Sequence, residues 1–333
     1  HRTKYSLRSH FSCELGVSRS SNIRNLGNRV QKTTIVDQFG APIYSKPQLV
    51  IASLNQDGTI DLSNIQPLND WNSGLRNSNL VAHAHGYDLM TILSEELGLV
   101  DVNDEGFLYA KIFITPDPNV SVMRLLGKIA EAMVVKECNE SVEANRLWGM
   151  YSRKGKRPHK SLDSFRAIGT GLNSTQRLYP TKYNPSDPQR DVIWINKENE
   201  KEELLQITNN TNCAISAGIQ LKVSMDGFKY IFKSDVARGK YDVPLVYFDL
   251  SNDYYKLTNA IYAEEHDVQI GADIVRGRDI SMSIHELLLS YYSVAYELVT
   301  GRMTIDQIIK DELLFDVFKK EVQEQSGKKI ISI

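Results

Sequence analysis

The sequence is poor in the features that mark several common classes of protein. It has only three cysteines in 333 residues, Cys13, Cys138 and Cys213, and no two of them have C-x-x-C spacing. We therefore expect neither a disulfide framework nor a zinc knuckle, and a reducing cytoplasm is the expected location. No apolar run approaches the length that spans a membrane and no signal peptide is visible, so no membrane partner is expected.

Several catalytic motifs are also missing. The sequence contains no P-loop, no G-x-G-x-x-G, no G-x-S-x-G and no internal repeat. ATP-driven, dinucleotide-dependent and serine-hydrolase functions therefore have no support. With 41% hydrophobic and 24% charged residues, the composition is that of a globular chain large enough for two domains or one elaborated domain.

Charge is distributed unevenly although the net charge is only -2. The stretch from Arg2 to Lys32 is basic, and a second basic segment lies between Tyr151 and Tyr183. Basic segments of this kind neutralise phosphates, although a solvated loop is the alternative. The candidate nucleic-acid contacts in the second segment are Arg153, Lys154, Lys156, Arg157, Lys160 and Arg177.

Residues 1–118 are expected to form a separate α+β domain. Asp57-Gly58 between two apolar runs predicts a β-hairpin, and further strands are expected at 80–84 and 107–114, with a helix over 87–97. His83 and His85 would share one strand face beside Asp88, which suggests a metal site, although no further cluster completes it. Pro116-Asp117-Pro118 marks the expected domain boundary.

A helix is predicted over 121–137, where apolar residues repeat every three or four positions. Glu131 lies beside this apolar stripe, and Gly127 one turn earlier would let a strand or a metal approach. Glu137 and Glu140, near the end of the helix, are expected to be free in solvent. For Glu131 an exposed position on the helix surface is the alternative interpretation.

The central stretch of the chain contains two short strands with polar groups. Asp191 stands immediately before the apolar run 192–195, and Gln220 and Lys222 alternate with apolar residues in 217–223. The period of two places Gln220 and Lys222 on one strand face. Between the strands, residues 200–207 are expected to form a helix. Asp187 is the alternative acid, but it sits in a turn-rich segment rather than beside the strand.

A carboxylate, an amide oxygen and a lysine at strand ends suit metal-dependent hydrolysis of a phosphodiester. The pattern resembles the PD-(D/E)xK, or restriction-endonuclease-like, nuclease superfamily, whose motif is an acid at a strand start followed by acid-x-Lys on the neighbouring strand. Asp191, Gln220 and Lys222 match these positions, and Glu131 matches the helical glutamate that often precedes them. Arg190 replaces the motif proline, and Gln220 replaces the second acid.

The resemblance implies an α/β fold, with a restriction-endonuclease-like mixed-sheet core flanked by helices. This core would span 119–265, with a helix over 228–237, a strand over 244–250 and a helix over 253–263. It would follow the N-terminal α+β domain and precede a helical C-terminal tail over 266–333, with one helix from Ser281 that Gly301 closes and another from Met303.

The resemblance also implies catalytic roles for Asp191, Gln220, Lys222 and Glu131. Asp191, the Gln220 oxygen, Glu131 and the Leu221 carbonyl would hold Mg²⁺ or Mn²⁺, and Lys222 would position water. The expected function is a metal-dependent DNA endonuclease of restriction or phage defence, acting on DNA, with a partner protein or a homodimer as further expectations. The alternatives are a catalytically inactive nuclease-like module for DNA binding or assembly, and a hydrolase centred on His83 and His85.

Overall fold

The computed structural model describes residues 50–54, 60–67, 75–105, 107–112, 114–208 and 211–309. The chain divides into two compact units, His1–Arg76 and Asn77–Ile333. In the first, β1 (Val50–Leu54) pairs antiparallel with β2 (Ile60–Pro67), which confirms the predicted hairpin. The basic stretch from Arg2 to Lys32 and most of the helix expected from Met303 lie outside the described residues.

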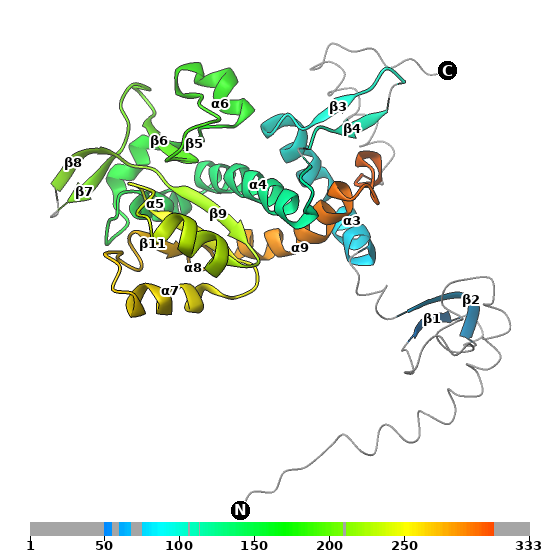
Figure 1. Cartoon of the computed structure of the whole chain (residues 1–333). Coiled ribbons are helices and arrows are strands. Elements are labelled where there is room, and N and C mark those ends of the chain that lie inside the picture. Colours follow the sequence, from blue (N-terminus) through cyan, green and yellow to red (C-terminus); the bar gives the residue numbers. More distant parts are fainter. Residues whose placement is uncertain are drawn as a thin grey trace, which may run out of the picture. The chain divides into compact units, whose positions relative to one another are not determined.

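The second unit is organised around the long helix α4 (Pro118–Glu140), which confirms the helix predicted over 121–137 (Figure 1). The Asp117 carboxylate accepts a hydrogen bond from the Asn119 N–H at 2.9 Å, and Pro118 occupies the first turn, where its missing N–H costs nothing. At the other end, the Ser141 hydroxyl accepts from the Ala144 N–H at 3.1 Å and so begins α5 (Val142–Ser152).

Two groups of strands pack beside α4. A parallel sheet has the order β11 (Ile274–Arg276), β10 (Leu245–Asp249), β9 (Gln220–Ser224). An antiparallel pair consists of β5 (Phe165–Gly169) and β6 (Val192–Asn196). An isolated bridge between Val192 and Ile219 joins the start of β6 to the residue before β9. This bridge brings Asp191 next to Gln220.

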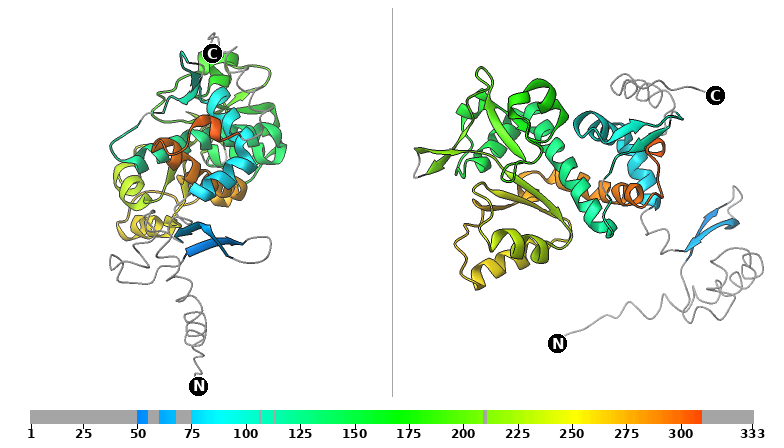
Figure 2. Two further views of the ribbon diagram at one scale, coloured as in Figure 1. Left: turned by 90° about the vertical axis from the view of Figure 1, so that its right-hand side faces the viewer. Right: turned by 45° about the horizontal axis from the view of Figure 1, so that its top comes forward.

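The parallel sheet is buried on both faces, as parallel sheets usually are. Leu245 and Tyr247 of β10 pack against helical segments η5 (Phe228–Val236) and α7 (Tyr254–Ala263). Val246 and Phe248 point to the opposite face, into the larger core that includes α4 and α9 (Met282–Val299). Figure 2 shows α9 crossing beside α4 in both views. The described architecture is a mixed α/β arrangement of helices around small sheets.

The other described elements of this unit connect or flank this core. They are α3 (Leu75–Thr91), η2 (Ile92–Glu96), β3 (Val100–Val102), β4 (Leu108–Ala110), η3 (Lys160–Ser164), α6 (Asn173–Leu178), η4 (Pro180–Lys182), β7 (Leu205–Thr208), β8 (Thr211–Ser216), α8 (Gly277–Ile280) and η6 (Ile305–Gln307).

Two predicted elements are wrong. The strand expected over 80–84 lies inside α3, because the buried positions Ala82, Leu89 and Leu93 follow helical spacing. The helix expected over 200–207 is replaced by the hairpin β7–β8. The charged residues of that segment favour a helix locally, but Leu204 instead donates its N–H to the Trp194 carbonyl at 2.9 Å and buries its side chain in the core.

The compact units do not follow the expected domain limits. The boundary falls between Arg76 and Asn77, whereas position 118 lies within the larger unit, directly before α4. α9, expected in a separate tail, packs against α4 and contributes Leu288, Tyr291 and Val294 to the same core. The site described below therefore lies within one unit.

Candidate active site

Four side chains predicted from separate parts of the sequence line a single cavity of about 540 Å³. Glu131 comes from α4, Asp191 immediately precedes β6, and Gln220 and Lys222 come from β9. The bridge between Val192 and Ile219 holds the two strands together at this point. These four residues are up to 91 positions apart in the chain, from 131 to 222, and the fold brings them together.

The Asp191 carboxylate is fixed by the neighbouring strand. Its Oδ2 accepts hydrogen bonds from Gln220 Nε2 at 2.5 Å and from the Leu221 N–H at 2.7 Å. Burial raises the pKa of Asp191, although the bond from Leu221 opposes that rise. The amide of Gln220 therefore does what an ionised carboxylate in its place could not: it donates a hydrogen bond to Asp191.

Glu131 is the more perturbed of the two acids. Its side chain is 4% exposed, and Lys128 Nζ donates to its Oε1 at 2.7 Å. Burial, followed by the negative charge of Asp191, raises the pKa of Glu131 to about 8. Lys128 and Lys222 act in the opposite direction. The two carboxylates are thus close enough to repel each other, and a cation between them would relieve that repulsion.

Two oxygen atoms at this site are buried without a partner. Glu131 Oε2 and Gln220 Oε1 have no hydrogen bond to any described residue. Buried acceptors are rarely left unpaired, because each loses its hydration without compensation. Carboxylate and amide oxygens are the donors that Mg²⁺ and Mn²⁺ prefer, so Glu131, Gln220 and Asp191 fit a hard divalent cation. Within the described residues no three His, Cys, Asp or Glu side chains cluster as metal ligands, because the third oxygen here is an amide.

Three lysines line the cavity, namely Lys128, Lys222 and Lys229, although the sequence analysis identified only Lys222. Lys222 is half-buried, with its Nζ 5.7 Å from the centre of the Tyr241 ring, and its charge lowers the pKa of both Glu131 and Asp191. Lys128 is held by its ion pair with Glu131. Its spacing of three residues before Glu131 on a predicted helix was the available signal, since such residues face each other.

The basic segment is only partly available to a ligand. Arg153 Nε donates to the Leu205 carbonyl at 2.8 Å, and Lys154 forms an ion pair with Asp273 at 2.7 Å, so both fasten the segment to the protein. The other four predicted contacts are exposed, namely Lys156, Arg157, Lys160 and Arg177. Among the described residues that line the cavity, none of the six predicted phosphate contacts occurs.

The structure also decides two secondary expectations. The segment that contains His83 and His85 belongs to the helix α3, so the strand that was expected to carry both on one face is wrong. The His85 ring packs edge-on to Tyr291. Glu137 is not free in solvent, because it accepts hydrogen bonds from Trp148 Nε1 and the Ser281 hydroxyl, each at 2.7 Å.

Asp187, the alternative acid, has a local structural role. Its Oδ1 accepts from the backbone N–H groups of Gln189 and Arg190 at 2.8 and 3.0 Å. These bonds close the turn that leads into β6. Asp187 does not belong to the described lining of the cavity, whereas Asp191 does.

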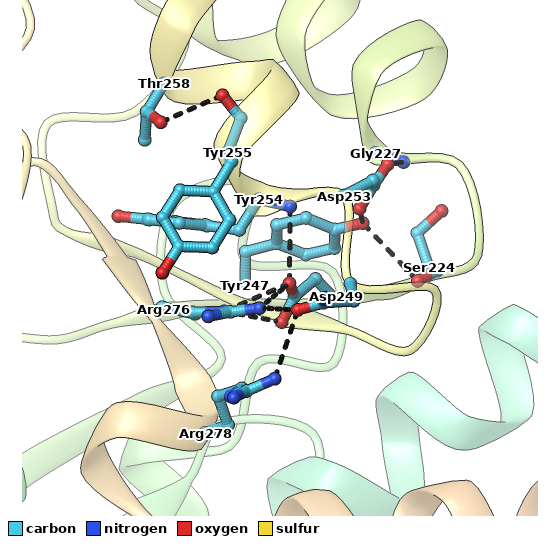
Figure 3. Close-up of polar contacts among 11 residues, drawn as sticks. Ser224, Gly227, Tyr247, Asp249, Asp253, Tyr254, Tyr255, Thr258, Arg276 and Arg278 are labelled. Atoms are coloured by element: carbon cyan, nitrogen blue, oxygen red, sulfur yellow. Dashed lines mark hydrogen bonds and ion pairs between the residues drawn. The ribbon is translucent and has the colours of Figure 1, made fainter. Parts of the chain in front are cut away.

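A second polar cluster, which the sequence analysis missed, joins the ends of β10 and β11 (Figure 3). Arg276 Nη2 pairs with Asp249 Oδ2 at 2.6 Å, and both side chains are buried. The Tyr247 hydroxyl donates to Asp253 at 2.6 Å, next to the start of α7. Since every one of these charges has a partner, the cluster holds two strands and a helix together rather than offering an open site.

Comparisons with protein-family models, curated proteins and solved structures give no match to this chain. Over the residues that the structure describes, no helix is both long enough and apolar enough to cross a membrane.

Proposed function

We propose that this chain is a metal-dependent nuclease that hydrolyses the phosphodiester bonds of DNA, with a restriction-endonuclease-like core. The observation that carries the proposal is the convergence of Glu131, Asp191, Gln220 and Lys222 on one cavity, with two buried oxygens that lack a partner. The order of the main elements beside the cavity, α4, β6, β9, η5 and β10, supports it, with shorter elements inserted between them, because helix, strand, strand, helix, strand is the order expected for such a core.

In this proposal Asp191, Glu131 and Gln220 would hold Mg²⁺ or Mn²⁺, which would polarise the scissile phosphate when bound. Gln220 donates through Nε2 to Asp191, and this bond orients the amide so that its oxygen is left for the cation. Lys222 lies in the same cavity and supplies a positive charge that positions the attacking water and offsets charge on the phosphate oxygens.

Charge balance supports a single cation. At the carboxylate end of the cavity Glu131 and Asp191 interact with Lys128 and Lys222, and the formal charges of these four groups cancel. Arg124, Asp226 and Lys229 complete the charged lining of the cavity. One divalent ion then gives the carboxylate end a net charge of about +2, which suits a phosphodiester whose negative charge grows toward about −2 as water attacks. The substitution of an acid by Gln220 is consistent with this balance, because a third carboxylate would remove one positive charge.

The test is incubation of plasmid DNA with Mg²⁺ or Mn²⁺, with and without a chelator. Cleavage that the chelator stops is the expected result. Lys222→Ala and Asp191→Asn should each abolish cleavage, and the asparagine retains an oxygen that accepts from the Leu221 N–H. Lys256→Ala, at an exposed position on α7, is the matched control and should cleave normally. Full activity of either site variant would refute the assignment.

A catalytically inactive module for DNA binding or assembly is the second candidate. The observation that favours it is Gln220, which places an amide beside Asp191 where the family motif has a second acid. Such a module would bind DNA equally well with and without the chelator and would never cut it. A role in restriction or phage defence, in the cytoplasm, with a partner protein or as a homodimer, follows from the family resemblance alone and extends the first proposal.

A further inference from the structure

The cavity that contains the proposed active site has an apolar part at the end away from the carboxylates. Large apolar side chains are exposed there: Val120 by 40%, Met225 by 42% and Tyr230 by 58%. They come from the start of α4, the turn after β9 and the first turn of η5. Single exposed apolar residues are ordinary, but a group of them around one cavity indicates a ligand surface.

The lining residues of α4 lie on successive turns of one helix face, from Val120 through Gly127 to Glu131. Eleven residues of α-helix rise by about 16 Å, so the cavity is an elongated groove along α4. The distance between the apolar end and the carboxylate end of the groove is thus several times the ~3.4 Å between stacked nucleotides of one strand. A strand that reaches both ends must extend over more than one nucleotide. In Figure 1 the arrow of β9 points toward the side on which α4 begins.

Gly127 lies in the middle of the groove and has no packing reason to be glycine. A Cβ atom placed there would meet nothing within 4 Å. Among the described glycines without a positive φ, every other one has a neighbouring atom within 4 Å of that position. Glycine inside a helix is unfavourable relative to alanine, so its presence above open space indicates that something must pass close to the helix.

The charges along the groove select an anionic ligand. Lys128 and Lys222 lie near the carboxylates, and Arg124 and Lys229 line the wall toward the apolar end, where Lys229 pairs with Asp226 at 3.5 Å on an exposed surface. The lining thus carries four cationic side chains and three acids, an excess of one positive charge. A ligand that presents phosphates and flat apolar groups together is a nucleic acid strand whose bases are unpaired. In a duplex the bases are stacked inside, and the exposed apolar side chains would face phosphates instead.

Resting on the nuclease function proposed above, we infer that this cavity is a single-strand groove, in which an unpaired base stacks on Tyr230 while the backbone crosses Gly127 to reach the carboxylates. The substrate is then a single strand, a flap or a frayed end rather than intact duplex.

The test measures binding by fluorescence anisotropy in Ca²⁺, and cleavage of the same probes in Mg²⁺. The probes are a labelled single-stranded DNA of about 12 nucleotides, an RNA of the same sequence and a blunt DNA duplex of that sequence. The wild-type protein should bind the single-stranded DNA at least about tenfold more tightly than the duplex. The affinity for the RNA, compared with that for the single-stranded DNA, shows whether the groove accepts ribose, deoxyribose or both.

Tyr230→Ala should weaken binding of the single strand by about fivefold or more and leave duplex binding unchanged. Tyr262→Ala is the matched control, because Tyr262 is 72% exposed on α7 and does not belong to the described lining of the cavity. Gly127→Ala should raise the midpoint of thermal unfolding and weaken binding of the single strand. A glycine with only a structural role would give the first effect without the second.

The outcomes separate this inference from the function on which it rests. Equal binding of single strand and duplex, with no loss in Tyr230→Ala or Gly127→Ala, overturns the groove even if metal-dependent cleavage occurs. Selective binding of the single strand without cleavage in Mg²⁺ or Mn²⁺ supports the groove and overturns the catalytic proposal. Binding of none of the probes by the wild-type protein overturns the inference, and cleavage of none of them overturns the nuclease function.

Discussion

Replacing Glu131 by glutamine should change how stability depends on pH. The pKa of Glu131 is raised from 4.5 to about 8, so the folded protein retains a proton that the unfolded chain releases. For an acid shifted in this direction, stability is greatest below the unfolded pKa and is lost as pH rises from about 4.5 to about 8. Glutamine cannot ionise, so Glu131→Gln should remove this loss.

The gap between pKa values of 4.5 and about 8 corresponds to at most about 5 kcal/mol in the free energy of unfolding. Lys128 and Asp191 share in the titration, so about 2 kcal/mol is a reasonable expectation. For a unit of this size, that corresponds to a rise in melting temperature of about 4–8 °C. The lost ion pair with Lys128 costs little, because the lysine side chain is 44% exposed.

The assay is thermal unfolding in chelator at about pH 5 and about pH 9, followed by titration with Mn²⁺. Glu131→Gln should match the wild-type protein near pH 5 and exceed it near pH 9. Mn²⁺ should stabilise the wild-type protein near pH 9 and the variant much less, because the variant has lost a charged ligand. Glu140→Gln is the control, since Glu140 is exposed on the same helix. Identical melting of variant and wild type at both pH values would refute the reasoning.

Three further variants test the site, the basic segment and the packing of β10. Gln220→Glu should lower the melting temperature in chelator, because the new carboxylate would face that of Asp191. The same variant should need less Mn²⁺ for stabilisation, and an unchanged Mn²⁺ titration would mean that the oxygen at position 220 is not a ligand. Neutralising Lys156 and Arg157 together should reduce the magnitude of the slope of log DNA affinity against log salt concentration by about two. An unchanged slope would mean that these two residues do not contact phosphates. Gly227→Ala should destabilise the protein by about 1–3 kcal/mol in denaturant unfolding, because its Cβ would overlap the Tyr247 hydroxyl, and wild-type stability would contradict that packing.

Part of this protein could be predicted from short stretches of sequence. The apolar spacing after Asp117-Pro118 predicted α4, and Asp57-Gly58 predicted the hairpin β1–β2. These features are local, because a helix or a tight turn is decided by residues a few positions apart. The Gln220-x-Lys222 spacing also fixed two side chains on one face of β9.

Other features depended on contacts between distant residues. The segment 200–207 has local helical character, yet it forms part of a hairpin because Trp194 and Ala217 bond to Leu204 from two sides. Glu137 was expected in solvent, but it accepts hydrogen bonds from Trp148 and Ser281. The apolar spacing of its own helix could not reveal these two contacts, because both partners lie outside that helix.

The sequence by itself determined which residue types could form the site, their order and the elements that present them. Only the tertiary structure decided that Asp191 bonds Gln220, that Glu131 is buried beside Asp191, and that Gly127 opens into a groove. The physical reason is that a side chain's proton affinity and free space depend on burial and on neighbours brought from elsewhere in the chain. Periodicity specifies the face on which a residue lies, but packing specifies what that face meets.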